Sequence, residues 1–231
     1  MDGQEHQRRA AEGERGPRQI KSRQRVRDLA EVYTHEREVN AMLDLVPDMF
    51  PCLGDPGNTD RTFLEPSCGS GNFLVEILCR KLRYVTPRRY GHGEDFEHRI
   101  LRCVGSVYGI DISADNVDEA RERMRSVIVE HLVEHAGSDE VTPGFREAVP
   151  AMLETNVICA DALVDATEIE LVEYRSGVTG TFVREWFPLH AEAGEPNLFS
   201  RSPRRDERPL HYSELARQAE PVRADSLDRA A

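Results

Sequence analysis

The stretch from residue 63 to 78, FLEPSCGSGNFLVEIL, constrains the fold of this chain more than any other. A short apolar run before Glu65 predicts a buried strand, and a helix face begins at Phe73. Between them, Gly69 and Gly71 allow the backbone to pass close to a ligand, and free N–H groups at a helix start favour an anionic group. Dinucleotide-binding loops have a third glycine in G-x-G-x-x-G, which is absent here. The sequence therefore predicts a strand–loop–helix ligand site without the dinucleotide fingerprint.

Strand and helix patterns alternate on either side of this stretch. Apolar runs predict two more strands, at 107–110 and 156–160. Apolar residues three or four apart predict helices at 28–45, 73–82, 96–103 and 117–132. Proline and glycine predict breaks at 47–60, 87–93 and 143–144. This order is typical of an α/β fold with a parallel, doubly wound sheet.

Composition narrows the class of protein. The 231 residues suit one domain with tails, and 30 Lys and Arg against 42 Asp and Glu give a net charge of −12. This acidic balance argues against a nucleic-acid binder that acts alone, although a local basic patch or a partner would change that. No apolar run is long enough for a membrane span or a secretory signal. The five cysteines are irregularly spaced without C-x-x-C, which favours a reducing, cytoplasmic location.

The sequence divides into three parts. We expect residues 1–27 to form a polar, basic tail and residues 28–190 to form the folded domain. Residues 191–231 form a polar C-terminal segment that we expect to be partly disordered. The basic tail could contact nucleic acid or simply be solvated.

Three segments in order resemble the motifs of S-adenosylmethionine-dependent adenine-N6 DNA methyltransferases. Residues 65–73, EPSCGSGNF, resemble the first motif, [DE]-P-x-C-G-S-G-x-F. Residues 107–112, VYGIDI, resemble the second, and residues 156–163, NVICADAL, resemble the third. Residues 30–34, AEVYT, resemble an N-terminal [FY]-T-P segment, with His35 in place of the proline. The resemblance spans about 21–163 and is closest to short proteins described as "restriction endonuclease subunit M".

The resemblance implies an S-adenosylmethionine site at the ends of three strands. A carboxylate ending the second strand can accept hydrogen bonds from ribose hydroxyls, which is the role expected for Asp111. Ile112 would pack on the adenine, and Asp161, beside Ala162, would accept a hydrogen bond from the adenine amine. Taken alone, Asp111 fits a strand-end turn residue better than a ligand contact, and its order with Glu65 and Asp161 favours the cofactor.

The methionine end of the cofactor would lie at the first motif. Glu65 would meet the ammonium group, and Gly69 and Gly71 allow close approach of the backbone. Pro66 and Asn72 are expected to contact the cofactor at the same motif. By resemblance, Tyr33 and Thr34 close over the methionine portion. Asp111 follows the glycine loop by about 40 residues rather than the usual about 20, so an inserted loop and helix, roughly 83–105, must lie between.

The catalytic tetrapeptide of adenine-N6 enzymes, [DNS]-P-P-[YFW], is absent from this sequence. In those enzymes it holds the target amine and stacks on the flipped base. The nearest substitute follows a possible fourth strand at 181–184, where Glu185 could polarise an amine and Trp186 or Phe187 could stack on a base. The alternative is a surface strand that the single tryptophan anchors. The catalytic residues are therefore left unassigned.

Several hypotheses about function remain open. The first is adenine-N6 DNA methylation, as the modification component of a restriction-modification or defence system. In this case a partner or specificity subunit would read the DNA sequence, and a restriction endonuclease subunit is a further possible partner. The second is a catalytically silent, cofactor-binding subunit that positions or regulates a partner methyltransferase or nuclease. Methylation of protein or RNA is a third. No metal site is expected, because His131 and His135, four residues apart, have no third ligand nearby.

Overall fold

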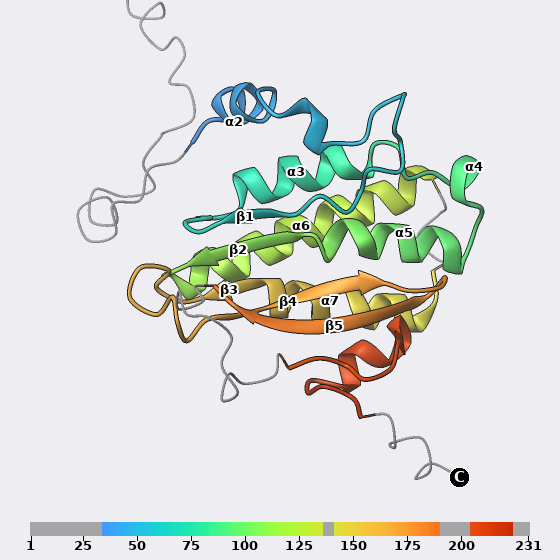
Figure 1. Cartoon of the computed structure of the whole chain (residues 1–231). Coiled ribbons are helices and arrows are strands. Elements are labelled where there is room, and N and C mark those ends of the chain that lie inside the picture. The colour runs from blue at the N-terminus through green and yellow to red at the C-terminus, as the bar shows by residue number, and fades with distance from the viewer. Residues whose placement is uncertain (1–33, 136–140, 190–203, 224–231) are drawn as a thin grey trace, which may run out of the picture.

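The computed structural model describes residues 34–135, 141–189 and 204–223 (Figure 1). Its helices are α2 (Glu36–Leu43), α3 (Asn72–Leu82), α4 (Pro87–Tyr90), α5 (Glu94–Val104), α6 (Ala114–His135) and α7 (Pro143–Asn156), with 3-10 turns η1 (Pro47–Met49) and η2 (Tyr212–Arg217). Its strands are β1 (Phe63–Glu65), β2 (Val107–Asp111), β3 (Val157–Cys159), β4 (Glu170–Ser176), β5 (Thr181–Pro188) and β6 (Leu210–His211). None of the described helices combines the length and apolarity that a membrane crossing requires.

The three strands expected from the sequence form one parallel sheet in the order β1-β2-β3. Every residue of the central strand β2 is buried, as expected where a parallel strand is covered on both faces. The register pairs Glu65 with Gly109 and Asp111 with Cys159, so the carboxyl ends of all three strands lie at one edge. The fold class is therefore α/β with a parallel sheet, as predicted.

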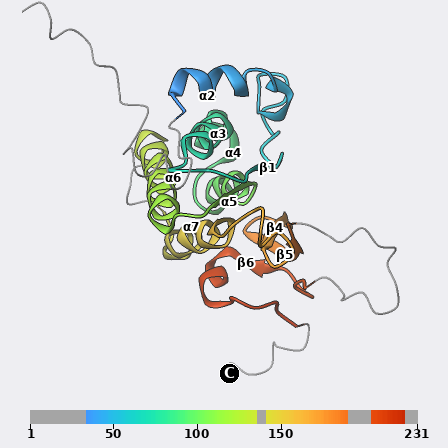
Figure 2. The ribbon, with the colours of Figure 1, turned by 90° about the vertical axis from the view of Figure 1, so that its left-hand side faces the viewer.

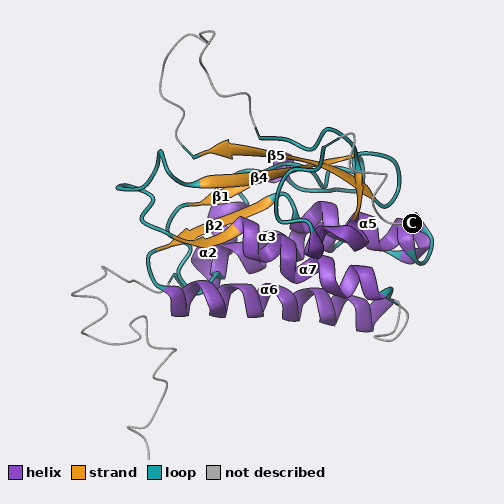
Figure 3. Cartoon of the chain, turned by 90° about the horizontal axis from the view of Figure 1, so that it is seen from below, coloured by secondary structure: helices purple, strands orange, loops and turns teal. Residues whose placement is uncertain are grey.

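Helices cover one face of this sheet. Figure 3 shows α3, α5, α6 and α7 gathered on one side of the strands. The packing is close at Gly109 in β2, where an added Cβ would lie 2.6 Å from Cδ1 of Leu74 in α3. Seen from the side (Figure 2), α2 lies beyond α3 at one end of the molecule, and β6 lies at the opposite end beyond α7.

The other face of β2 is covered by a β-hairpin, β4–β5, and not by the helices that a doubly wound sheet would place there. Tyr108 and Ile110 form a small buried cluster with Ile169 and Leu171. The hydroxyl of Tyr108 also donates a hydrogen bond to the carbonyl of Val172, at 3.1 Å. The hairpin is antiparallel and belongs to a second sheet, β4-β5-β6, so the possible fourth strand does not continue the parallel sheet.

The expected breaks at two prolines are in fact helix starts. Pro143 is the first residue of α7, where its missing N–H leaves no hydrogen bond unmade. The side chain of Thr142 accepts a hydrogen bond from the N–H of Phe145, at 3.2 Å, and so caps the helix. Pro87 likewise begins the short helix α4.

Residues 204–223 fold back onto the domain. β6 pairs with β5, and η2 packs on α7 so closely that a Cβ on Gly144 would lie 2.5 Å from Cβ of Ser213. Arg184 in β5 and Asp206 form a buried ion pair, with Nε and Oδ2 2.9 Å apart. The carboxylate of buried Glu97 accepts hydrogen bonds from the hydroxyls of Tyr212 and Thr142. These contacts make the segment part of the core.

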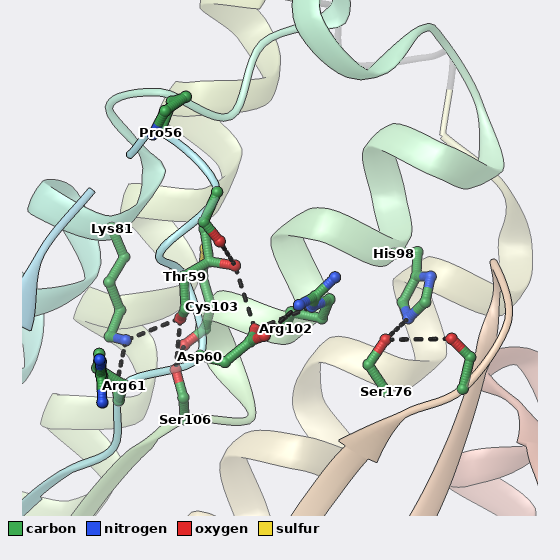
Figure 4. A network of polar contacts seen from close by, with 12 residues as sticks. Pro56, Thr59, Asp60, Arg61, Lys81, His98, Arg102, Cys103, Ser106 and Ser176 are labelled. Atoms are coloured by element: carbon green, nitrogen blue, oxygen red, sulfur yellow. Dashed lines mark hydrogen bonds and ion pairs between the residues drawn. The ribbon is translucent and has the colours of Figure 1, made fainter. Parts of the chain in front are cut away.

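A polar network at the amino ends of β1 and β2 fixes the loop that leads into the sheet (Figure 4). The fully buried Lys81 donates hydrogen bonds to the carbonyls of Thr59, at 2.9 Å, and Arg61, at 2.5 Å. Burial lowers the pKa of Lys81 to about 8. Arg102 pairs with Asp60 in the same loop, with Nε and Oδ1 2.9 Å apart. The polar groups of this network pair with one another at the end of the sheet opposite the glycine loop.

Candidate functional site

The candidate site is the loop Cys68–Gly71, at the carboxyl end of β1. Gly69 and Gly71 both have positive φ, at 52° and 83°, which favours glycine. A Cβ on Gly71 would lie 2.8 Å from Cβ of Ala120 in α6, so this glycine also permits close packing. A Cβ on Gly69 would meet no atom within 4 Å. The loop thus presents open space at Gly69 while its back rests on α6.

The loop leads directly into the N-terminus of α3. Gly71 is the N-cap residue and supplies no side-chain cap. The first N–H groups of a helix have no partners within the helix, and the helix dipole makes this end attractive to an anion. The loop and the helix start therefore offer backbone donors to the carboxylate of a ligand.

Asp111, at the end of β2, holds this loop. Its Oδ2 accepts a hydrogen bond from the N–H of Gly69 at 2.8 Å. Its Oδ1 accepts from the N–H of Ser113 at 2.9 Å and from Nδ2 of Asn116 at 3.1 Å. A carboxylate has about four acceptor positions, and these three donors leave room for about one more on Oδ2. Asp111 can thus accept one ribose hydroxyl without releasing the loop, although the second hydroxyl would compete with an existing donor.

Glu65 ends β1 beside the loop. It is half-buried, and its Oε1 accepts a hydrogen bond from the N–H of Ser67 at 3.2 Å. Burial raises the pKa of Glu65 above its usual value, which means that the ionised carboxylate is poorly solvated. A cationic group of a ligand would relieve that cost, as the expected ammonium contact requires. Pro66, which follows, is exposed.

Asp161 follows β3 at the same edge of the sheet. Its Oδ1 accepts hydrogen bonds from the N–H groups of Leu163, at 2.9 Å, and Val164, at 3.1 Å. Ala162 packs on the apolar cluster of the hairpin face. Ile112, just beyond β2, is 50 % exposed, so a large apolar side chain is free to lie on a flat ring.

Thr34 and Asn72 join the N-terminal side of the site. Nδ2 of Asn72 donates a hydrogen bond to the carbonyl of Thr34, at 3.0 Å, so Thr34 lies next to the start of α3. Tyr33 lies outside the described residues. The parallel sheet and this hydrogen bond thus bring Thr34, Glu65, the glycine loop, Asp111 and Asp161 to one edge.

Arg123 of α6 also contacts the loop and carried no recognisable signal in the sequence. Its Nη1 donates to the carbonyl of Ser70 at 2.6 Å and to Oδ1 of Asn72 at 2.7 Å. Three arginines lie close together on this helix, and only folding distinguishes the one that reaches the loop. By contrast, Cys68 in the loop is buried, and burial raises the pKa of its thiol to about 12, which makes it a packing residue rather than a nucleophile.

The segment considered as a substitute catalytic motif has structural contacts instead. Two guanidinium groups lie over the ring of Trp186, with the Cζ of Arg184 4.8 Å and that of Arg204 5.4 Å from its centroid. Glu185 is paired with Arg175, at 3.2 Å. Phe187 is 36 % exposed and lies with its ring edge toward Tyr108. Trp186 therefore anchors the hairpin to the C-terminal segment.

The two histidines of α6 are part of the packing. Nε2 of His131 lies 2.7 Å from the carbonyl of Val85, and the His131 ring contacts Phe96 and His135. Burial lowers the pKa of His131, so the neutral ring is favoured. In the described part of the chain, no three His, Cys, Asp or Glu side chains converge on a possible metal position.

Comparison with known proteins gives one informative similarity. No family model matches the chain, and no solved structure matches it. The chain is 30 % identical over 76 residues to the adenine-specific methyltransferase PglX of Streptomyces coelicolor. The match covers 33 % of this chain and 6 % of that protein, so the chain spans a small part of the relative's length. The similarity supports a distant relationship to a methyltransferase.

Proposed function

We propose that the chain is a Rossmann-like domain that binds S-adenosylmethionine at the ends of β1, β2 and β3. The observation that carries this proposal is the 2.8 Å hydrogen bond between the N–H of Gly69 and Oδ2 of Asp111, which are 42 residues apart. This hydrogen bond joins the glycine loop after β1 to the carboxylate at the end of β2. The sequence predicts the cofactor site from these two features. The open space at Gly69 and the uncapped start of α3 fit the same ligand.

Each group has a distinct task in this proposal. S-adenosylmethionine supplies an activated methyl group on a positively charged sulfur. The helix start and the loop N–H groups bind the carboxylate of its methionine end, and Glu65 binds the ammonium. Asp111 accepts a ribose hydroxyl, Ile112 covers the adenine, and Asp161 accepts from the adenine amine. Holding the methyl in line with an incoming amine lowers the entropic part of the barrier, and a site with little water favours loss of the sulfonium charge.

The favoured reaction is transfer of the methyl group to N6 of adenine in DNA, as the modification component of a restriction-modification or defence system. The relative's name, adenine-specific methyltransferase, and the motif resemblance support this substrate. Because the net charge is −12, we place DNA recognition on a partner or specificity subunit, and a restriction endonuclease subunit is a second possible partner.

A second candidate function is a cofactor-binding subunit that positions or regulates a partner and has no catalysis of its own. The contacts of Trp186 and Glu185 favour it, because they engage the side chains of the nearest substitute for the missing tetrapeptide. Among the described strands, β1 is also an edge strand of its sheet, and its Leu64 side chain is 44 % exposed, which leaves apolar surface on which a partner could pack.

Two measurements on the purified full chain test these functions in sequence. Calorimetry with S-adenosylmethionine and S-adenosylhomocysteine should show saturable binding at one site, and no binding of either compound would refute the proposal. Transfer of radiolabelled methyl to unmethylated genomic DNA then separates the two candidates. Incorporation into adenine means that the chain is a complete enzyme. Binding without incorporation favours the subunit, and its partner is then sought by co-purification.

A further inference from the structure

We propose that Arg123 and the side chain of Asn72 form a clamp that holds the glycine loop in its ligand-binding conformation. This inference rests on the proposed function, because it assigns these residues to the cofactor site. They are positioning residues: Arg123 acts from α6 through the loop backbone and Asn72, and neither side chain is needed as a direct ligand of the cofactor.

The clamp fixes one peptide unit of the loop at both ends. The carbonyl of Ser70 accepts a hydrogen bond from Nη1 of Arg123 at 2.6 Å. The N–H of Gly71, in the same peptide unit, donates to the carbonyl of Cys68 at 2.9 Å. A loop with two glycines at positive φ has many alternative conformations when free. Fixing this peptide plane before the ligand arrives removes much of the entropic cost of ordering the loop on binding.

Asn72 extends the clamp to the N-terminal side. Its Oδ1 accepts from Arg123 at 2.7 Å, and its Nδ2 donates to the carbonyl of Thr34 at 3.0 Å. The contact with Arg123 orients the amide so that its NH₂ group faces Thr34. Both ends of the side-chain amide are therefore engaged within the protein, which gives Asn72 a positioning role in place of the direct contact expected from the sequence.

Arg123 also places a cation at a helix start. The three groups to which it donates hydrogen bonds are all neutral acceptors: the carbonyl and the hydroxyl of Ser70 and the amide oxygen of Asn72. No ion pair between Arg123 and a carboxylate is present among the described residues. The positive charge next to the N-terminus of α3 is unfavourable for an empty helix start but favourable once a carboxylate binds there. The clamp thus suits an anionic ligand group.

The test measures the loop and the cofactor separately, in the full chain. Arg123→Met should increase hydrogen–deuterium exchange of the peptide that covers residues 68–72 in the free protein. It should also weaken binding of S-adenosylhomocysteine by about tenfold or more, the effect of losing a charged hydrogen bond. Arg123→Lys, which keeps a donor and the charge, should recover part of the affinity. Arg125→Met is the matched control, because Arg125 is an exposed arginine on the same helix that pairs with Glu122.

The outcomes distinguish the clamp from the proposed function. If Arg123→Met leaves both loop exchange and affinity unchanged, the clamp is refuted. If Arg123→Met and Arg125→Met lower thermal stability to the same extent and weaken binding of S-adenosylhomocysteine to the same extent, Arg123 has only a structural role and the inference is overturned. In the Asn72→Ala background, Arg123→Met should cost less affinity than in the wild type, and full additivity would refute action through Asn72. If the wild type binds neither cofactor form, the proposed function fails and the role of the clamp in cofactor binding fails with it, whereas a change in loop exchange in Arg123→Met would show only that Arg123 orders the loop.

Discussion

At the scale of single residues, the carboxylate of Asp111 is the group on which the geometry of the site depends most. Asp111 accepts hydrogen bonds from the protein at three donors and is only 8 % exposed. The sequence predicts the ligand contact from its position at the end of β2. It does not predict the contact with Gly69, because that depends on how the loop turns back toward β2. The residue therefore holds the loop in place, in addition to the ligand contact that we propose for it.

Asp111→Ala should weaken S-adenosylmethionine binding by about tenfold or more, since it removes a charged acceptor and frees the loop. Isothermal titration calorimetry on the full chain gives the affinity directly. Asp115→Ala is the control, because Asp115 is exposed in the first turn of α6. An affinity in Asp111→Ala equal to that of the wild type would contradict the assignment of the ribose to this residue.

His98 makes the stability of the protein depend on pH. It is buried between α5 and the hairpin, with Nδ1 accepting from the N–H of Gly180 at 2.9 Å, and burial lowers its pKa from 6.5 to about 4. The unfolded chain therefore takes up a proton near pH 6.5 while the folded protein does not. The stabilisation is complete above about pH 6.5 and is lost as the pH falls toward about 4.

Urea unfolding at a series of pH values between about 7.5 and about 4 should show this loss of unfolding free energy, because the series covers the pH range in which histidine titrates. His98→Asn keeps an acceptor for Gly180 but cannot titrate, so its stability should fall less steeply over the same range. Because burial also lowers the pKa of His131, some slope should remain in the variant. Equal slopes in the two proteins would show that His98 is not the source.

At the scale of elements, the sequence predicts the parts with strong local patterns. The apolar runs before Glu65 and at β2 and β3 predict buried strands, and the spacing in α6 predicts a helix with one buried face. The structure confirms the three strands and the helix, but only β2 is buried throughout. The prediction of a buried strand before Glu65 is wrong, because β1 lies at the edge of its sheet with Leu64 exposed. The proline rule fails at Pro143 because proline both breaks and begins helices, and only the capping contact of Thr142 distinguishes the two.

The hairpin was harder to predict. β4 carries a partial alternation over ELVEYRS, but its burial depends on contacts with β2 and α7 that are remote in sequence. Residues 204–223 join the core through four buried apolar side chains, Leu210, Tyr212, Leu215 and Val222, and through polar contacts with Arg184 and Glu97. These apolar positions are scattered among polar and charged residues, so sequence periodicity does not identify them.

Trp186→Ala should destabilise the fold without altering the cofactor site. Loss of a buried tryptophan costs about 3 kcal/mol or more of unfolding free energy, and here it also removes the surface on which Arg184 and Arg204 stack. Urea unfolding should report this loss, while calorimetry at low temperature should give an unchanged cofactor affinity. Phe187→Ala, at the more exposed neighbour, should cost less.

The opposite result would restore the catalytic hypothesis for this segment. If Trp186→Ala kept its stability and its cofactor affinity but lost methyl transfer, residues 185–188 would be acting on the substrate. The contacts of Glu185 with Arg175 would then have to open during the reaction.

At the scale of the whole molecule, charge limits how the chain meets nucleic acid. A net charge of −12 repels a polyanion, and neutralising phosphates requires Lys and Arg on the contact surface. We therefore expect no saturable binding of a labelled DNA duplex by the purified chain at about 0.15 M salt, measured by fluorescence anisotropy. Binding that weakens steeply with added salt would instead show that a local basic patch is sufficient and that no partner is needed for DNA contact.

The return of residues 204–223 to the core also determines when this protein can finish folding during its synthesis. Tyr212 meets Glu97 across 115 residues, and Val222, near the end of the segment, is 6 % exposed and belongs to the main core. Long-range contacts of this kind form only after both partners have left the ribosome. The glycine loop and the first strands are translated before residues 204–223, yet the domain that holds them stays incomplete until Val222 has been translated. A message truncated before residue 204 would therefore yield a chain that lacks these core contacts, although every strand of its parallel sheet would be present.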